Sequence, residues 1–204
     1  MPPPVEPSAS PPVYRVKGNV YLGTKSYFER KVPGGLDVLY AAIRDPELLA
    51  FIQQKFLTVA WYDVLPSVPL IRAEARALGL SVRAYLEQRA AYQAEHDLSG
   101  IYRFFLRVVG TENVAMRLPR VFVQTYDFGT SEVKVLEPGH IEGFIRDFPN
   151  VLYEWFSTAL PTYATTALRR TGAKDAVVTA RRAEAMGTGA LPLTSLHLDF
   201  RWGV

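Results

Sequence analysis

The chain has 204 residues, of which 49% are hydrophobic and 21% charged, so its composition is that of a globular protein and excludes wholesale disorder. It contains no cysteine, which excludes disulfides, thiol nucleophiles and thiolate metal sites, and its three histidines leave little material for a metal centre. The net charge is only +3, with Lys and Arg scattered among acidic residues, so we expect no nucleic-acid partner.

The N-terminal segment is rich in proline, since six of the fifteen prolines fall within residues 1–12. Proline removes backbone donors and favours extended conformations, so we predict a disordered tail over residues 1–13 and a single domain over residues 14–204. A ligand for an SH3-like domain is the alternative interpretation of this tail. The chain shows neither the basic and apolar regions of a signal peptide nor an apolar stretch of the ~20 residues that a membrane span needs. We therefore expect a cytoplasmic protein with no membrane partner.

After this tail, the first half of the chain is predicted to be mostly helical. Alternating hydrophobic residues indicate one short strand over residues 13–22, interrupted by Gly18. Helical spacing then predicts five helices, over residues 36–43, 46–56, 70–78, 82–93 and 101–109. Asp45, Ser81 and Ser99 are the predicted N-caps of the second, fourth and fifth of these helices.

Beyond Pro119 the pattern predicts a β-β-α-β-β unit with an antiparallel sheet. The four strands are predicted in pairs, over residues 121–126 and 133–136 and over residues 175–183 and 193–202. The long helix between the pairs has Asn150 as its predicted N-cap and Gly172 as its stop. The fold class is therefore α+β, with an N-terminal strand and a helical subdomain followed by the β-β-α-β-β unit.

No catalytic constellation stands out in the sequence. The histidines fall in three different predicted elements, and neither a nucleophile elbow nor a phosphate-binding loop is found. Glu74, Glu87 and Glu95 are predicted on exposed helix faces, in solvated ion pairs with nearby arginines. We therefore expect a protein that is not an enzyme, with no catalytic residues, no metal site and no cofactor.

The distinctive feature of the sequence is its aromatic content of 12%, much of it on or beside predicted helices. Aromatic stripes on helices line either a packed core or a ligand cavity, and the sequence leaves both interpretations open. The candidate ligand-binding residues are Trp61, Tyr102, Phe105, Trp155, Phe156 and Tyr163.

Several short motifs carry a family resemblance when they are taken together with the order of the elements. They are residues 16–21 (VKGNVY), 100–102 (GIY), 117–122 (RLPRVF), 170–173 (RTGA) and 198–202 (LDFRW). With these motifs the chain resembles the superfamily of haem-nitric-oxide-binding domains and 4-vinyl-reductase-like domains, over about residues 14–203. The first two motifs are similar to the start and the haem-ligand helix of the haem-binding members. The other three most closely resemble a set of paralogous proteins of myxobacteria of similar length.

The same resemblance shows where this chain departs from the haem-binding members. Their ligand histidine follows Gly-Ile, at the position where this chain has Tyr102. Their Tyr-x-Ser-x-Arg motif holds the haem propionates, whereas this chain has Phe128 in place of the serine and Thr130 in place of the arginine. Tyrosine can ligate haem iron, but without the arginine the propionates lose a bidentate charge-assisted pair. We therefore expect no haem cofactor.

The superfamily resemblance implies a sensory fold with a cleft between the helical subdomain and the β-β-α-β-β unit. The leading hypothesis is a non-enzymatic regulatory or sensory module that binds a small, partly apolar ligand or a protein partner there. The alternative is a structural or scaffolding protein, which forms a homodimer through exposed strands or the aromatic helix and fills the cavity with its own side chains. A haem-based gas sensor that uses Tyr102 is the third hypothesis.

Overall fold

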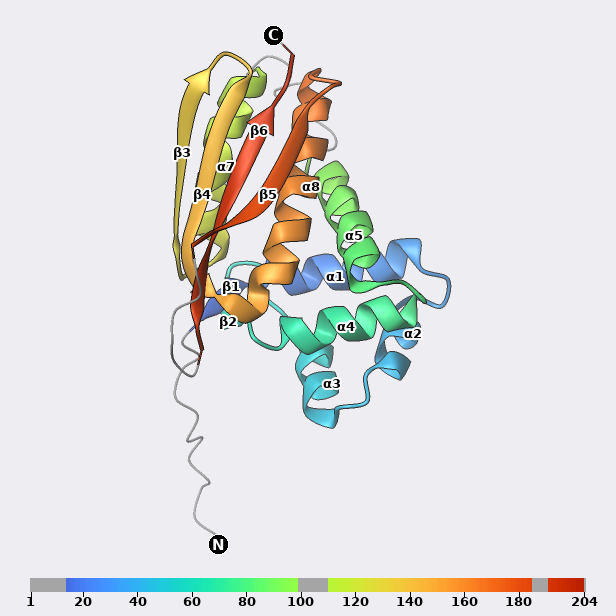
Figure 1. The fold of residues 1–204 in the computed structure, drawn as a ribbon. Helices are drawn as coiled ribbons and strands as arrows, with labels where there is room; N and C mark the ends of the chain where they lie inside the picture. Colours follow the sequence, from blue (N-terminus) through green and yellow to red (C-terminus); the bar gives the residue numbers. More distant parts are fainter. Residues whose placement is uncertain (1–13, 99–109, 185–190, 204) are drawn as a thin grey trace, which may run out of the picture.

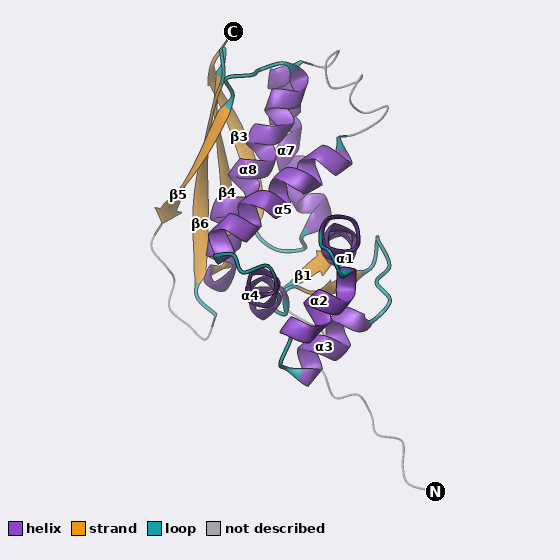
Figure 2. Cartoon of the chain, turned by 90° about the vertical axis from the view of Figure 1, so that its right-hand side faces the viewer, coloured by secondary structure: helices purple, strands orange, loops and turns teal. Residues whose placement is uncertain are grey.

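The larger sheet of the computed structural model has four antiparallel strands, and the model describes residues 14–98, 110–184 and 191–203. The strands are β3 (Thr130–Glu137), β4 (His140–Pro149), β5 (Val177–Glu184) and β6 (Leu193–Arg201). Their order in the sheet is β3-β4-β6-β5. Two helices, α7 (Thr111–Thr125) and α8 (Tyr153–Thr171), lie on one face of this sheet (Figure 1 and Figure 2). The predicted β-β-α-β-β unit and the α+β fold class are confirmed.

The first half of the chain forms the predicted helical part. Its helices are α1 (Asn19–Lys31), α2 (Gly35–Ala42), α3 (Pro46–Gln53), α4 (Ser67–Ala77) and α5 (Val82–Asp97). Two short strands, β1 (Arg15–Lys17) and β2 (Trp61–Asp63), pair antiparallel in a second sheet. The helix α5 packs along α8 and so joins the helical part to the sheet part (Figure 2). No helix among the described residues is both long and apolar enough to cross a membrane.

Two of the three predicted helix caps are confirmed by hydrogen bonds. The Asp45 carboxylate accepts hydrogen bonds from the backbone N–H groups of Glu47 and Leu48 at the start of α3. The Ser81 hydroxyl accepts one from the backbone N–H of Ala84 at the start of α5. The predicted helix over residues 101–109 and its cap Ser99 lie outside the described residues.

The predicted strand over residues 13–22 is wrong in its second half, because β1 ends at Lys17 and α1 begins at Asn19. The buried residues of α1 are Tyr21, Thr24, Tyr27 and Phe28, which recur at helical spacing. Of these positions only Tyr21 lies within residues 13–22, so the longer helical period decides the structure.

Gly18, at the junction of β1 and α1, lies too close to the neighbouring backbone for any side chain. A Cβ atom there would lie 2.3 Å from the carbonyl oxygen of Leu57 and 2.8 Å from the Tyr62 ring. We expect Gly18→Ala to destabilise the protein by about 1–3 kcal/mol in urea unfolding, as overpacked sites do. Gly23→Ala is the control, because its Cβ would meet only the ends of the flexible Arg89 and Gln93 side chains. Equal stability of the Gly18 variant and the wild type would contradict this account.

The predicted strand over residues 121–126 is also wrong, since these residues form the last turns of α7 and the residue that follows. In a strand, Val121 and Val123 would share one face and Phe122 would take the other. The structure buries Phe122 and leaves Val121 and Val123 about half exposed. Burial of the single large ring against α8 therefore outweighs the β propensity of the two valines.

The strand that pairs with β3 is β4, which the sequence pattern did not predict. The two strands pair antiparallel through a tight turn at Pro138 and Gly139. Alternation places Ile141 and Ile145 in the core, but Gly143 stands between them. Asp147 then has a positive φ of 58°, and the register to β6 shifts between Ile145 and Phe148. The glycine and the bulge together obscure the strand pattern.

The long helix α8 begins differently from the prediction and ends as predicted. Asn150 opens a short 3-10 turn, η1 (Asn150–Leu152), and its side-chain oxygen accepts a hydrogen bond from Arg182 at 2.7 Å instead of capping α8. Gly172, with a left-handed φ of 116°, terminates the helix. The two last strands, β5 and β6, lie where the sequence predicted them.

Aromatic side chains cluster in both parts of the molecule. Two clusters of the helical part consist of Tyr21, Phe51, Phe56 and Tyr62, and of Tyr27, Phe28, Tyr85 and Tyr92. The cluster between α7, α8 and the sheet consists of Phe122, Tyr126, Phe128, Phe148 and Phe156. The strand β1 ties the two parts together, because Val16 forms a β-bridge with Tyr126 and the backbone N–H of Arg15 donates to Asp127 at 2.6 Å.

Candidate functional site

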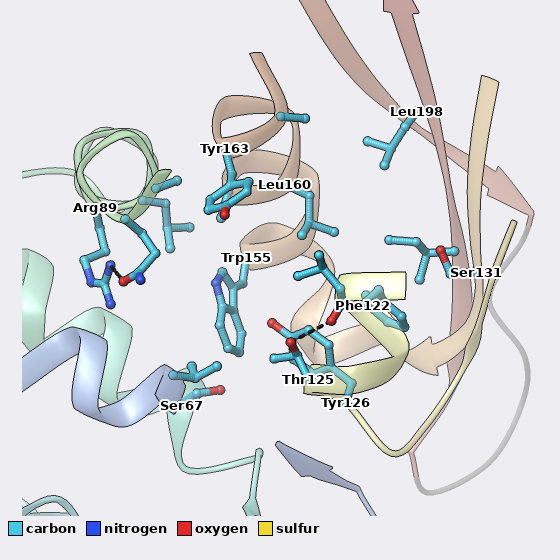
Figure 3. Close-up of a pocket in the computed structure, with 18 of the residues that line it drawn as sticks. Ser67, Arg89, Phe122, Thr125, Tyr126, Ser131, Trp155, Leu160, Tyr163 and Leu198 are labelled. Carbon is cyan, nitrogen blue, oxygen red and sulfur yellow. Dashed lines mark hydrogen bonds between the residues drawn. The ribbon is translucent and has the colours of Figure 1, made fainter. Parts of the chain in front are cut away.

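A cavity of about 250 Å³ lies where the helical part meets the sheet part. Its lining comes from α1, α4 and α5 on the helical side, and from α7, α8, β3, β4 and β6 on the other. Figure 3 shows Trp155 and Tyr163 on α8 between Arg89 on α5 and Phe122 on α7. Most of the lining is apolar, as is usual for a site that holds a small organic molecule.

The helix α8 supplies one wall of this cavity. Trp155, Ala159 and Tyr163 are spaced four residues apart, so they lie along one line of the helix, and Leu160 lies beside them. Trp155 and Tyr163 are both half-buried. The Tyr163 hydroxyl donates to Asp97 of α5 at 3.3 Å, and burial together with this carboxylate raises the pKa of Tyr163. The hydrogen bond links the wall to α5.

Of the six residues that the sequence singled out, Trp155 and Tyr163 line the cavity. Phe156, their neighbour on α8, is fully buried in the aromatic cluster and does not border the cavity. Trp61 lies on β2, where the ammonium of Lys17 is 3.8 Å from its ring centroid, and it does not border the cavity either. We therefore leave Phe156 and Trp61 out of the proposed ligand site. Tyr102 and Phe105 lie outside the described residues.

The polar end of the cavity is formed by residues that sequence reasoning had placed elsewhere. Glu74, predicted on an exposed helix face, is only 1% exposed and lines the cavity from α4. The prediction of a solvated ion pair with a nearby arginine is confirmed for Glu87, which pairs with Arg83 at 3.0 Å. Glu95 also forms an exposed ion pair, but its partner at 2.9 Å is the distant Arg170 of α8. Helical spacing could have predicted the burial of Glu74. This residue lies three residues after Ile71 and four after Leu70, so it falls on the same apolar face of the helix.

Burial controls the ionisation of Glu74. Loss of water around the carboxyl raises its pKa from 4.5 to about 7. The hydroxyls of Tyr85 and Thr24 and the guanidinium of Arg89 act in the opposite direction and lower the pKa by less. Burial likewise raises the pKa of the Tyr85 hydroxyl. A carboxyl group that changes its charge near neutral pH therefore faces the cavity.

Haem is the group to test against this cavity, because the sequence resembles haem-binding proteins. If a cavity of about 150 Å³ holds benzene, one of this size holds about ten non-hydrogen atoms, and a porphyrin has several times as many. The described lining contains no histidine, and a tyrosine binds iron as its phenolate. Burial raises the pKa of the lining residues Tyr21, Tyr85, Tyr126 and Tyr163, which works against that phenolate. The described residues do not fit haem.

The histidines of the sheet take part in polar contacts away from the cavity lining. Nε2 of His140 lies 2.9 Å from Asp199, and Nε2 of His197 lies 2.9 Å from Glu142. Within the described ranges, no group of three or more His, Asp or Glu side chains is arranged to hold a metal ion.

Comparison with known proteins gives a structural likeness and no sequence match. No family model matches the chain, and no curated protein matches it. The unliganded Fe(II) H-NOX protein from K. algicida superposes with a TM-score of 0.63 at 12% identity, covering 92% of this chain and 97% of that one. An oxygen-binding H-NOX domain related to soluble guanylate cyclases gives a TM-score of 0.62 at 13% identity, covering 92% and 95%. A substituted T. tengcongensis H-NOX gives 0.63 at 12%, covering 92% and 98%. This chain therefore has the fold of the H-NOX domains, over nearly the whole length of each.

Proposed function

We propose that the protein is a non-enzymatic sensory module that binds a small, partly apolar ligand in the cavity between its helical part and its sheet part. The observation that carries this proposal is the cavity of about 250 Å³, with Trp155 and Tyr163 in its wall. The H-NOX fold supports it, because one structural neighbour is described as an oxygen-binding domain. The motifs that resemble those of the myxobacterial set support a sensory module related to that set. We also expect the protein to be cytoplasmic.

The position of the cavity explains how binding would be reported to a partner. A ligand in it would touch α4 and α5 on one side and α8 and the sheet on the other. A ligand shifts the equilibrium between two arrangements of these elements when it binds one arrangement more tightly than the other. The hydrogen bond between Tyr163 and Asp97 joins the same elements at 3.3 Å, so occupancy and this contact are coupled. A protein partner that recognises one arrangement would complete the sensor.

Native mass spectrometry of the protein purified from its own host tests this function. We expect one small molecule per chain, and we expect Trp155→Ala and Tyr163→Ala to reduce the bound fraction. Trp61→Ala is the matched control, since it removes another half-buried aromatic side chain that does not border the cavity. Retention unchanged in both cavity variants would contradict the proposal.

Two other observations on the same purified protein, its oligomeric state by native mass spectrometry and its absorbance spectrum, test the alternative functions. A homodimer without any bound molecule supports the scaffolding protein. A Soret band that persists through gel filtration and disappears in Tyr102→Phe supports the haem-based gas sensor. We expect neither, because the described cavity is open and does not fit haem.

A further inference from the structure

One end of the cavity contains buried polar atoms that have no hydrogen-bond partner among the described residues. They are Oε1 of Glu74, the hydroxyl of Tyr85 and Nε of Arg89. All three residues line the cavity, and the side chains of Glu74 and Tyr85 belong to residues that are each 1% exposed. Buried polar groups are nearly always paired in folded proteins, so unpaired ones that face a cavity mark where a bound molecule supplies the missing partner.

The chemistry of these three atoms specifies the partner group. The Glu74 carboxylate oxygen needs a donor, and Nε of Arg89 needs an acceptor. The Tyr85 hydroxyl is close enough to lower the pKa of Glu74, yet it forms no hydrogen bond of ordinary geometry with any described residue. A hydroxyl lowers the pKa of a carboxyl by donating to it, so the Tyr85 oxygen remains available as an acceptor. A single group that both donates and accepts would satisfy this end of the cavity.

Charge at the same end selects against ions. An anionic ligand would meet the Glu74 carboxylate, and a cationic ligand would meet the permanent charge of Arg89. The Arg89 guanidinium contacts two other residues, because its Nη1 donates to Gln93 at 2.7 Å and its central carbon lies 5.9 Å from the Tyr27 ring centroid. Either ion would also lose its water in an apolar cavity, which is costly without full compensation. An uncharged polar group meets neither repulsion.

The remaining lining of the cavity determines the size of the ligand and the chemistry of its apolar part. Its walls next to the polar end are apolar and include Ile71, Leu86, Trp155 and Leu160. Scaled from the cavity of about 150 Å³ that takes benzene, the volume fits about ten non-hydrogen atoms. An aromatic or aliphatic body of this size would lie against the Trp155 indole.

We propose, resting on the proposed function, that the cavity selects an uncharged amphipathic molecule of this size, with a hydroxyl group that donates to Glu74 and accepts from Arg89. The class is small, largely apolar alcohols, in contrast to the amines, carboxylic acids and plain hydrocarbons of the same shape.

A series of four probes with the same ring tests the selection: 2-phenylethanol, phenethylamine, phenylacetate and ethylbenzene. Each is titrated into the protein at about pH 8, and the indole N–H resonances are followed by NMR. Trp155 reports on the cavity, whereas Trp61 and Trp202 do not border it and serve as internal references. We expect 2-phenylethanol to shift Trp155 and to bind about tenfold more tightly than each of the other three, which is close to the lower end of the usual effect of a hydrogen bond to a charged group.

Two variants of Glu74 separate recognition from folding. Glu74→Met removes the acceptor with little change in length, and we expect it to abolish the preference for 2-phenylethanol over ethylbenzene while ethylbenzene still shifts Trp155. Glu74→Gln keeps a side-chain acceptor, and we expect it to keep the preference. A preference that survives in Glu74→Met, or tighter binding of the amine or the acid by the wild type, overturns the alcohol assignment and leaves the ligand cavity standing. The absence of any Trp155 shift with all four probes overturns the cavity function as well.

Discussion

Replacing Phe156 by alanine is expected to destabilise the protein by about 3–5 kcal/mol, the usual cost of removing a buried aromatic ring. Phe156 is fully buried, and its ring lies 5.0 Å from the rings of Tyr126 and Phe148 and 5.8 Å from that of Phe122. These neighbours come from α7 and from the end of β4, so they cannot close the space without moving whole elements. Urea unfolding followed by circular dichroism measures the loss.

Trp155→Ala provides the matched comparison, because Trp155 is the residue immediately before Phe156 on α8. One side of the indole already faces the cavity, so fewer packing contacts are lost on truncation than at a core site. We expect a smaller loss of stability than in Phe156→Ala, although tryptophan is the larger residue. Equal losses in the two variants would show that Trp155 is an ordinary core residue, and the cavity wall would then be wrongly assigned.

Glu74→Gln is expected to stabilise the protein at about pH 8 and to leave its stability nearly unchanged at about pH 4. The carboxyl has a pKa of about 7 in the folded protein and an ordinary value of 4.5. The folded state therefore holds this proton more tightly than the unfolded chain, so raising the pH from about 4.5 to about 7 favours unfolding. The difference in pKa corresponds to about 3 kcal/mol, which is lost over that range and is absent in the glutamine variant.

The measurement is urea unfolding of both proteins at several pH values, with Glu29→Gln as the control. Glu29 is an exposed glutamate on α1, and surface substitutions of this kind change stability by within about 0.5 kcal/mol. The difference between wild type and Glu74→Gln should grow with pH and level off above about pH 7. A difference that is constant across the range would mean that Glu74 stays ionised in the folded protein, contrary to its burial.

The order of elements could largely be predicted from the sequence, because local signals mark where each one begins and ends. Asp45 and Ser81 accept the hydrogen bonds of helix N-termini, and Gly172 takes the left-handed conformation that ends α8. These signals depend on a few neighbouring residues, so they can be read without knowledge of what packs against them. The α+β class and the β-β-α-β-β unit follow from them.

Two of the errors lie where long-range packing overrides local propensity. The run from Val121 to Val123 has the composition of a strand, but burial of Phe122 against α8 makes it helical. The strand β4 is interrupted by Gly143 and by the bulge at Asp147, and only its pairing with β3 and β6 identifies it. Pairing of strands distant in sequence is not encoded in any short window.

The candidate site divides in the same way between sequence and tertiary structure. The aromatic stripe of α8 indicated Trp155 and Tyr163, because helical spacing alone places them on one face. Spacing cannot distinguish a cavity wall from a core, and only the packing of α7 and the sheet sets Phe156 in the core and Trp155 at the cavity. Glu74 is the clearest case: the sequence supplies a carboxyl on a helix, and burial by the surrounding elements removes its water and raises its pKa, although Tyr85 and Arg89 partly oppose this rise. Its environment, and with it the chemistry of the cavity, is decided by the tertiary structure, because desolvation depends on every element that surrounds a group.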